Sequence, residues 1–172
     1  LNHRRDFIKY DPSKVPDYRE GILGFWVRSD SQVQYASPQL HSLEEERRLQ
    51  LIDLLAKISR DNERILSLQL AANPDGAEIP IVVASLKSKE IGEPAHEVVA
   101  KVIETKENFY GLRNGVATVT VPVKDRNGNI IAAARMRLNS KKTTTRRKDL
   151  SYGNNIAKQL QARIANRQFL FK

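Results

Sequence analysis

The sequence predicts an α+β fold in which antiparallel strands are covered by helices. Segments with helical spacing of apolar residues are separated by segments in which apolar and polar residues alternate. Their order along the chain is helix, hairpin, helix, short strand, hairpin, helix. Both pairs of strands are joined by turn sequences rather than by helices, which indicates antiparallel pairing and a sheet with helices laid on it.

The first helix is expected at residues 42–63. Ser42 followed by Glu45 forms a capping box. Apolar residues then recur at helical spacing at Leu51, Leu54, Leu55 and Ile58. Residues 1–40 show no such pattern, and we interpret them as an N-terminal arm that precedes a single domain at 41–172. The arm is either an extra layer on this domain or the remnant of a preceding module.

A hairpin and a second helix follow. Strands are predicted at 65–71 and 79–85, around the strong turn sequence Asn73-Pro74-Asp75-Gly76. After a loop, a helix is expected at 95–105, where one face carries Val98, Val99, Val102 and Ile103.

The second hairpin predicts its own register. A short strand at 108–112 precedes strands at 116–124 and 130–138, and Asn127-Gly128 is a strong signal for a two-residue turn. This turn would form one apolar face by pairing Val119, Val121 and Val123 with Met136, Ala134 and Ala132. The other face would pair Thr118, Thr120 and Pro122 with Arg137, Arg135 and Ala133.

The last helix is expected to begin at Asp149 or Ser151, either of which can cap it. Its apolar face consists of Ile156, Leu160 and Ile164.

Positive charge is concentrated in one segment. The chain has 29 Lys and Arg residues against 20 Asp and Glu, a net charge of +9, and residues 137–148 contain bases but no acid. Such a loop is most simply a solvated connection, although contact with phosphate or membrane headgroups is an alternative. No aromatic residue is interleaved in it to stack on single-stranded nucleic acid.

Several classes of chemistry lack the residues they need. The sequence contains no cysteine, which excludes disulfides and thiolate catalysis, and no apolar run long enough to span a membrane. His96-Glu97 could begin the zinc-binding motif His-Glu-x-x-His of metalloproteases. Position 100, where the second histidine is needed, is alanine. Asp125 begins a turn sequence, where aspartate is typically structural. We therefore expect no enzyme, no metal and no cofactor.

Four short motifs resemble those of Cache-type sensor domains, the extracytoplasmic relatives of PAS domains. They are VVAS at 82–85, KEIGEP at 89–94, TVTVPVKD at 118–125 and NGNIIA at 127–132. The resemblance covers roughly 45–138. It implies a five-stranded antiparallel sheet of PAS-like order, with the long N-terminal helix on one face and a C-terminal helix. The loop 86–94 and the helix 95–105 would roof a small-molecule pocket on the other face.

Such domains sense organic acids, amino acids or similar solutes in signal transduction, so the resemblance also implies an extracytoplasmic, periplasmic or secreted location in a bacterium. The chain begins with Leu1 and its only methionine is Met136. An N-terminal signal or anchor that has been removed would explain this start, as would trimming of the chain.

The predicted register gives a candidate binding site. It brings together Thr118, Thr120 and Arg135 on the polar face, and hydroxyls beside a guanidinium suit a carboxylate. Ser85 and Lys87 could approach from the second strand and Tyr110 from the short third strand. The alternative is that Arg135 and Arg137 simply lie on a solvated sheet face.

The preferred interpretation is a domain that binds an organic acid or amino acid and signals by closing the loop 86–94 over it. One alternative is binding of nucleic acid or an acidic surface through 137–148, although nucleic acid is the less expected partner. Another is a homodimerisation module that uses the helix at 42–63 and binds no ligand.

Overall fold

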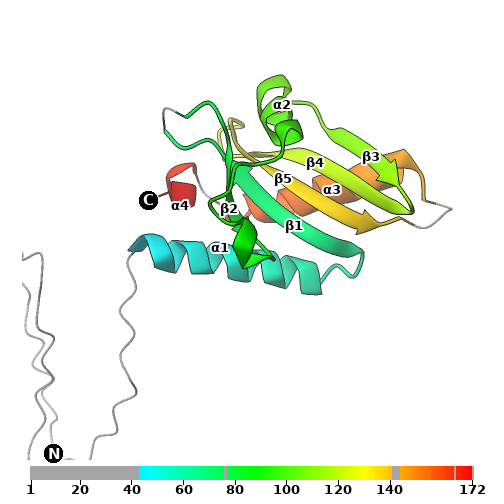
Figure 1. The fold of residues 1–172 in the computed structure, drawn as a ribbon, viewed down its shortest axis with the longest axis horizontal. Coiled ribbons are helices and arrows are strands. Elements are labelled where there is room, and N and C mark those ends of the chain that lie inside the picture. The colour runs from blue at the N-terminus through cyan, green and yellow to red at the C-terminus, as the bar shows by residue number, and fades with distance from the viewer. Residues whose placement is uncertain (1–42, 76, 141–143, 165, 172) are drawn as a thin grey trace, which may run out of the picture. The chain divides into compact units, whose positions relative to one another are not determined.

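The computed structural model has an antiparallel sheet with helices on both of its faces, which confirms the α+β prediction (Figure 1). It describes residues 43–75, 77–140, 144–164 and 166–171. The predicted arm at 1–40 and the capping box of Ser42 lie outside these residues. The helices are α1 (Leu43–Arg60), η2 (Ser88–Glu90), α2 (Glu97–Thr105), α3 (Arg146–Gln161) and α4 (Gln168–Phe171). The strands are β1 (Ile65–Ala72), β2 (Ile81–Ser85), β3 (Phe109–Arg113), β4 (Val116–Lys124) and β5 (Ile130–Asn139).

The five strands are ordered β2-β1-β5-β4-β3, and all neighbours are antiparallel. The β4–β5 pairing contains every predicted partner, including Val119 opposite Met136 and Thr120 opposite Arg135. The two faces of this hairpin therefore carry the residues that the alternation assigned to them.

The turn between β4 and β5 differs from the predicted two-residue turn. Asp125 N donates to Asn129 O at 2.8 Å, so the loop spans 126–128. A two-residue type I′ turn needs positive φ at both central residues, but among the described residues only Gly128 of this pair has one. The register is unchanged at the centre of the hairpin because a bulge between the pairs Val123–Ala132 and Lys124–Ile130 compensates for the longer loop.

One face of the sheet carries the larger core. α1 contacts β1 and β2, while α3 contacts β4 and β5. Of the predicted apolar positions, Leu51, Leu55 and Ile58 of α1 and Ile156 and Leu160 of α3 are buried there, and Leu54 is partly buried against the same core. Ile164, just beyond α3, is also buried in this core. The apolar stripe of α1 is therefore used inside the domain, and homodimerisation through this helix stays a prediction.

The opposite face carries α2. Val99 and Val102 of this helix are buried against Ala71, Val82 and Ala133 of the sheet. His96 caps the N-terminus of α2, since its Nδ1 accepts from Val98 N at 3.2 Å. The helix over the second face is thus present where the sequence predicted it.

Several predicted boundaries were wrong. α1 ends at Arg60 because Asn62 Nδ2 caps the carbonyl of Ile58 at 2.7 Å. α3 begins at Arg146 rather than at Asp149 or Ser151, since the hydroxyl of Thr145 accepts from Lys148 N. No helix in the described part of the chain is both long and apolar enough to cross a membrane.

Candidate functional site

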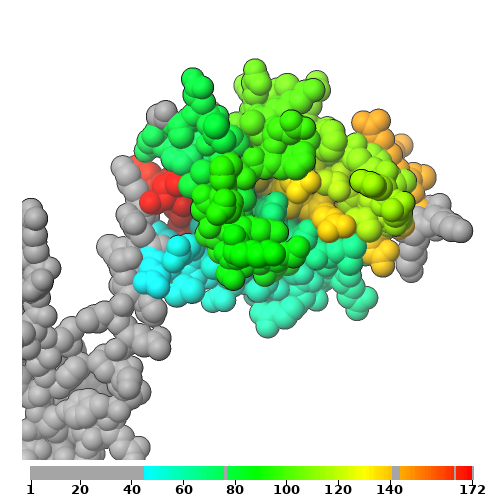
Figure 2. Space-filling view, viewed as in Figure 1, coloured from blue at the N-terminus to red at the C-terminus, as the bar shows by residue number. Residues whose placement is uncertain are grey.

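A row of five side-chain positions crosses the α2 face of the sheet. The pairings place Ser85 opposite Gln69, Gln69 opposite Arg135, Arg135 opposite Thr120, and Thr120 opposite Phe109. Because paired residues of antiparallel strands point to the same side, all five share this face. We call the four polar residues, Ser85, Gln69, Arg135 and Thr120, the polar row, and Phe109 lies at its β3 end. Figure 2 views this face and shows β5 in yellow between green segments of the chain.

Two side chains of the polar row hold buried polar atoms without partners. Neither Thr120 Oγ1 nor Arg135 Nε is accessible to solvent, and neither has a hydrogen-bond partner among the described residues. An unsatisfied buried polar group costs about 1–3 kcal/mol. Burial, and then the charge of Arg137, lowers the pKa of Arg135, whereas the charge of Glu90 raises it. The site thus has an unused donor and an unused hydroxyl side by side.

Glu90 of η2 borders the polar row at its β2 end. Its carboxylate accepts from Gln69 Nε2 at 2.6 Å and from Ser85 Oγ at 2.7 Å. Lys87 Nζ lies 3.7 Å from its other oxygen. The hydrogen bonds from Ser85 and Gln69 lower the pKa of Glu90, so this carboxylate is anionic at neutral pH.

The structure brings together most of the residues that the sequence proposed for the site. Thr120 and Arg135 are direct partners, and Thr118 lies on the same face opposite Arg137. Ser85 belongs to the polar row but its hydroxyl is used by Glu90. Lys87 lies at the edge, with an exposed side chain that pairs with Glu90.

Tyr110 does not join this group, and its predicted approach to Arg135 was wrong. It pairs with Val119, whose side chain lies in the larger core, so Tyr110 points to the α3 face. There its hydroxyl donates to Asp149 Oδ2 at 3.3 Å. Phe109 takes the position beside Thr120 instead.

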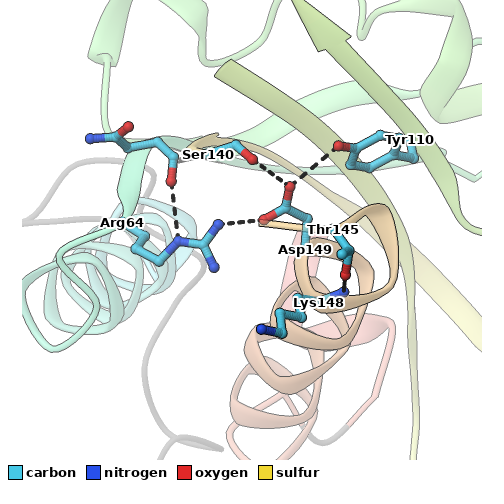
Figure 3. Close-up of polar contacts among 7 residues, drawn as sticks. Arg64, Tyr110, Ser140, Thr145, Lys148 and Asp149 are labelled. Atoms are coloured by element: carbon cyan, nitrogen blue, oxygen red, sulfur yellow. Dashed lines mark hydrogen bonds and ion pairs between the residues drawn. The ribbon is translucent and has the colours of Figure 1, made fainter. Parts of the chain in front are cut away.

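Asp149 is the centre of a polar cluster on the α3 side (Figure 3). Its fully buried carboxylate accepts from the guanidinium of Arg64 and from Ser140 Oγ, the latter at 2.8 Å. Burial and the adjacent carboxylate raise the pKa of Tyr110. Every oxygen of Asp149 has a partner, so the cluster fastens α3 to the sheet and offers no free group for a ligand.

Sequence reasoning missed Gln69 and Glu90. Gln69 alternates with leucines in a predicted half-buried strand, and that alternation already placed it opposite the core. Its neighbour across the sheet could not be predicted from the local sequence, because β1 pairs with β5, far along the chain.

In the described part of the chain, no group of three or more acidic or histidine side chains could hold a metal ion. The chemistry that the polar row offers is hydrogen bonding to an anion.

No protein-family model matches the sequence. No curated protein matches it either.

Solved structures of similar fold include several GAF domains. The GAF domain of an Acinetobacter phosphoenolpyruvate-protein phosphotransferase is 12% identical, with a TM-score of 0.50 over 67% of this chain and 80% of that one. The second GAF domain of DevS from Mycobacterium smegmatis is 10% identical, with a TM-score of 0.47 over 67% and 94%. A free methionine-R-sulfoxide reductase from Thermoplasma acidophilum is 11% identical, with a TM-score of 0.48 over 72% and 99%. At these identities the likeness concerns the fold, which is the PAS-like arrangement that the sequence predicted.

Proposed function

We propose that this domain is a signalling module that binds a small organic anion, an organic acid or an amino acid, on the polar row. The observation that carries the proposal is the pair formed by Arg135 and Thr120, each with a buried polar atom that lacks a partner. A guanidinium donates to a carboxylate more strongly than to a neutral group, and an adjacent hydroxyl adds a further donor. The proposal assigns binding rather than catalysis.

The GAF-like fold supports the signalling role. In this fold the polar row lies on one face of the sheet and α1 packs on the other, so the sheet connects the proposed ligand to α1. Thr120 is fully buried, so an anion that reaches it must displace part of its cover. η2 is suited to this movement because it is short and its Glu90 interacts with Arg135. An anion that binds Arg135 would compete with Glu90 for this guanidinium. It would thereby favour a second position of η2 and of the adjoining β2, and α1 packs against β2.

The resemblance of four motifs to those of Cache-type domains supports an extracytoplasmic location, which we include in the proposal. A fusion of the complete encoded protein to a reporter that is active only outside the cytoplasm tests this part. Reporter activity is the expected result. An inactive fusion, together with an active fusion to a second reporter that works only in the cytoplasm, would contradict it.

A thermal-shift screen tests the binding proposal. Carboxylic acids, amino acids, purines and a DNA duplex would be added at two salt concentrations. A ligand at 100 times its Kd adds about 2.7 kcal/mol to the free energy of unfolding. We expect a shift of several degrees with one class of acids, and its loss in Arg135→Ala.

The matched control is Arg126→Ala, which removes an exposed arginine from the β4–β5 turn. It should keep the shift. An equal shift in Arg135→Ala and wild type would place the anion elsewhere. A shift with DNA alone that high salt removes would favour the basic segment 137–148 instead.

A further inference from the structure

The polar face continues beyond Arg135 into a second group of positive charges. One step along the hairpin, Thr118 pairs with Arg137, and Gly111 of β3 pairs with Thr118. Because glycine has no side chain, β3 places no side chain directly opposite Thr118. A surface cavity of about 420 Å³ opens there, lined by Arg113, Asn114, Val116, Thr118 and Arg137.

The lining of this cavity contains two arginines and no acid. Arg113 and Arg137 are both exposed, and neither forms an ion pair with another described residue. Arg137 also lies on the same face as Arg135, two positions away on β5, and their like charges repel, which contributes to the lowered pKa of Arg135. Arg113 and Arg137, which have no carboxylate partner among the described residues, therefore lie on the same stretch of the sheet face as Arg135, and an anion would relieve the repulsion between these guanidinium groups.

We propose that this cavity binds the second anionic group of a dianionic ligand, a short-chain dicarboxylic acid. This inference rests on the proposed function, which assigns the first carboxylate to Arg135 and Thr120. Alternate residues of a strand are about 6.7 Å apart, which is twice the rise per residue. A chain of a few carbon atoms spans this distance, and its second carboxylate would accept from Arg137, Arg113 and the hydroxyl of Thr118.

The test compares dicarboxylates with monocarboxylates of equal length by calorimetry: succinate with butyrate, glutarate with valerate, and adipate with hexanoate. We expect wild type to prefer one dicarboxylate at least tenfold over its partner. Arg137→Gln and Arg113→Gln should each weaken the dicarboxylate about tenfold and change monocarboxylate binding less than about twofold. Arg126→Gln is the control for loss of an exposed arginine.

Gly111→Val is an independent test of the second anion site, because it changes no charge. A Cβ at Gly111 would lie 3.6 Å from the ring of Phe109, an ordinary contact, and valine suits a strand. The added side chain would pack against Thr118, its partner across the strand pair and a residue of the cavity lining, so the preference for dicarboxylates should fall while the melting temperature without ligand is kept. Retained preference in Gly111→Val, Arg113→Gln and Arg137→Gln would overturn the second site.

The outcomes separate this inference from the proposed function. If both acid classes bind equally to wild type and Arg135→Ala abolishes both, the first site stands and the second is refuted. If no acid of either class binds, both proposals fail.

Discussion

Thr120 and Arg135 are partners across the β4–β5 pair, and each buries one polar atom that has no hydrogen-bond partner in the described part of the chain. By contrast, the buried polar groups of Asp149 and Ser140 on the α3 side satisfy one another. Unsatisfied pairs of this kind lower stability, and proteins tolerate them mainly where a ligand or function uses them. This contrast distinguishes the polar row from the structural cluster on the α3 side.

Thr120→Val should stabilise the protein without ligand. It replaces a buried hydroxyl that has no partner by a methyl group of similar size, so we expect a gain of roughly 1 kcal/mol in the free energy of unfolding. The same change removes a donor to the anion and should weaken acid binding. Urea denaturation and calorimetry measure the two effects, and Thr105→Val, which removes a hydroxyl bonded to Lys101 O, is the control. A destabilised Thr120→Val with unchanged affinity would contradict the assignment.

Asp149→Ala should destabilise the protein by about 2–4 kcal/mol, because it leaves Ser140, Tyr110 and the partly buried Arg64 without their shared acceptor. Chemical denaturation measures the loss. Asp75→Ala is the matched control, since its pair with Arg167 is mostly exposed, and it should cost less than about 0.5 kcal/mol. Equal losses in the two variants would refute the structural role of the cluster.

Gly153→Ala should destabilise the protein even though alanine favours helices by about 1 kcal/mol. Its Cβ would lie only 2.6 Å from Val119 Cγ1, so α3 must move away from β4, at a cost of roughly 1–3 kcal/mol. The double variant with Val119→Ala should recover part of this loss. Additive losses in the denaturation experiment would show that the two residues do not make this close contact.

Glu90→Gln should lower stability at neutral pH by about 0.5–1 kcal/mol. The pKa of Glu90 is depressed in the folded protein, so its contribution is present above the unfolded value near 4.5 and is lost as pH falls through the folded value. The difference between wild type and variant should therefore shrink below about pH 4.5. Glu104→Gln on α2 is the matched control. A difference that stays constant from pH 7 to pH 3 would argue against a charge effect.

The fold followed from the sequence where side chains alternate clearly. In β4 and β5 the alternation sorts residues into an apolar and a polar face, and a slip of one residue would mix them, so the register was predicted correctly. The turn was predicted less well, because Asn127 does not adopt the positive φ of a two-residue turn and a bulge restores the register.

The errors at the site came from short or non-local features. β3, with the sequence FYGLR, does not alternate, so nothing local indicated that Phe109 rather than Tyr110 lies beside Thr120. Asp149 is a good capping residue by type, but its partner Arg64 lies 85 residues away in sequence. Such pairings depend on how strands and helices meet in the folded chain, which a local pattern does not contain.

The most direct test of the account follows the Nε–H proton of Arg135 by NMR, assigned by its absence in Arg135→Lys. This donor has no partner in the described structure, and a carboxylate that binds the polar row should accept from it. Titration with the acid selected by the thermal-shift screen should move this resonance downfield, with the same Kd that calorimetry gives. A resonance that does not move while the acid binds and shifts signals elsewhere would contradict the central claim.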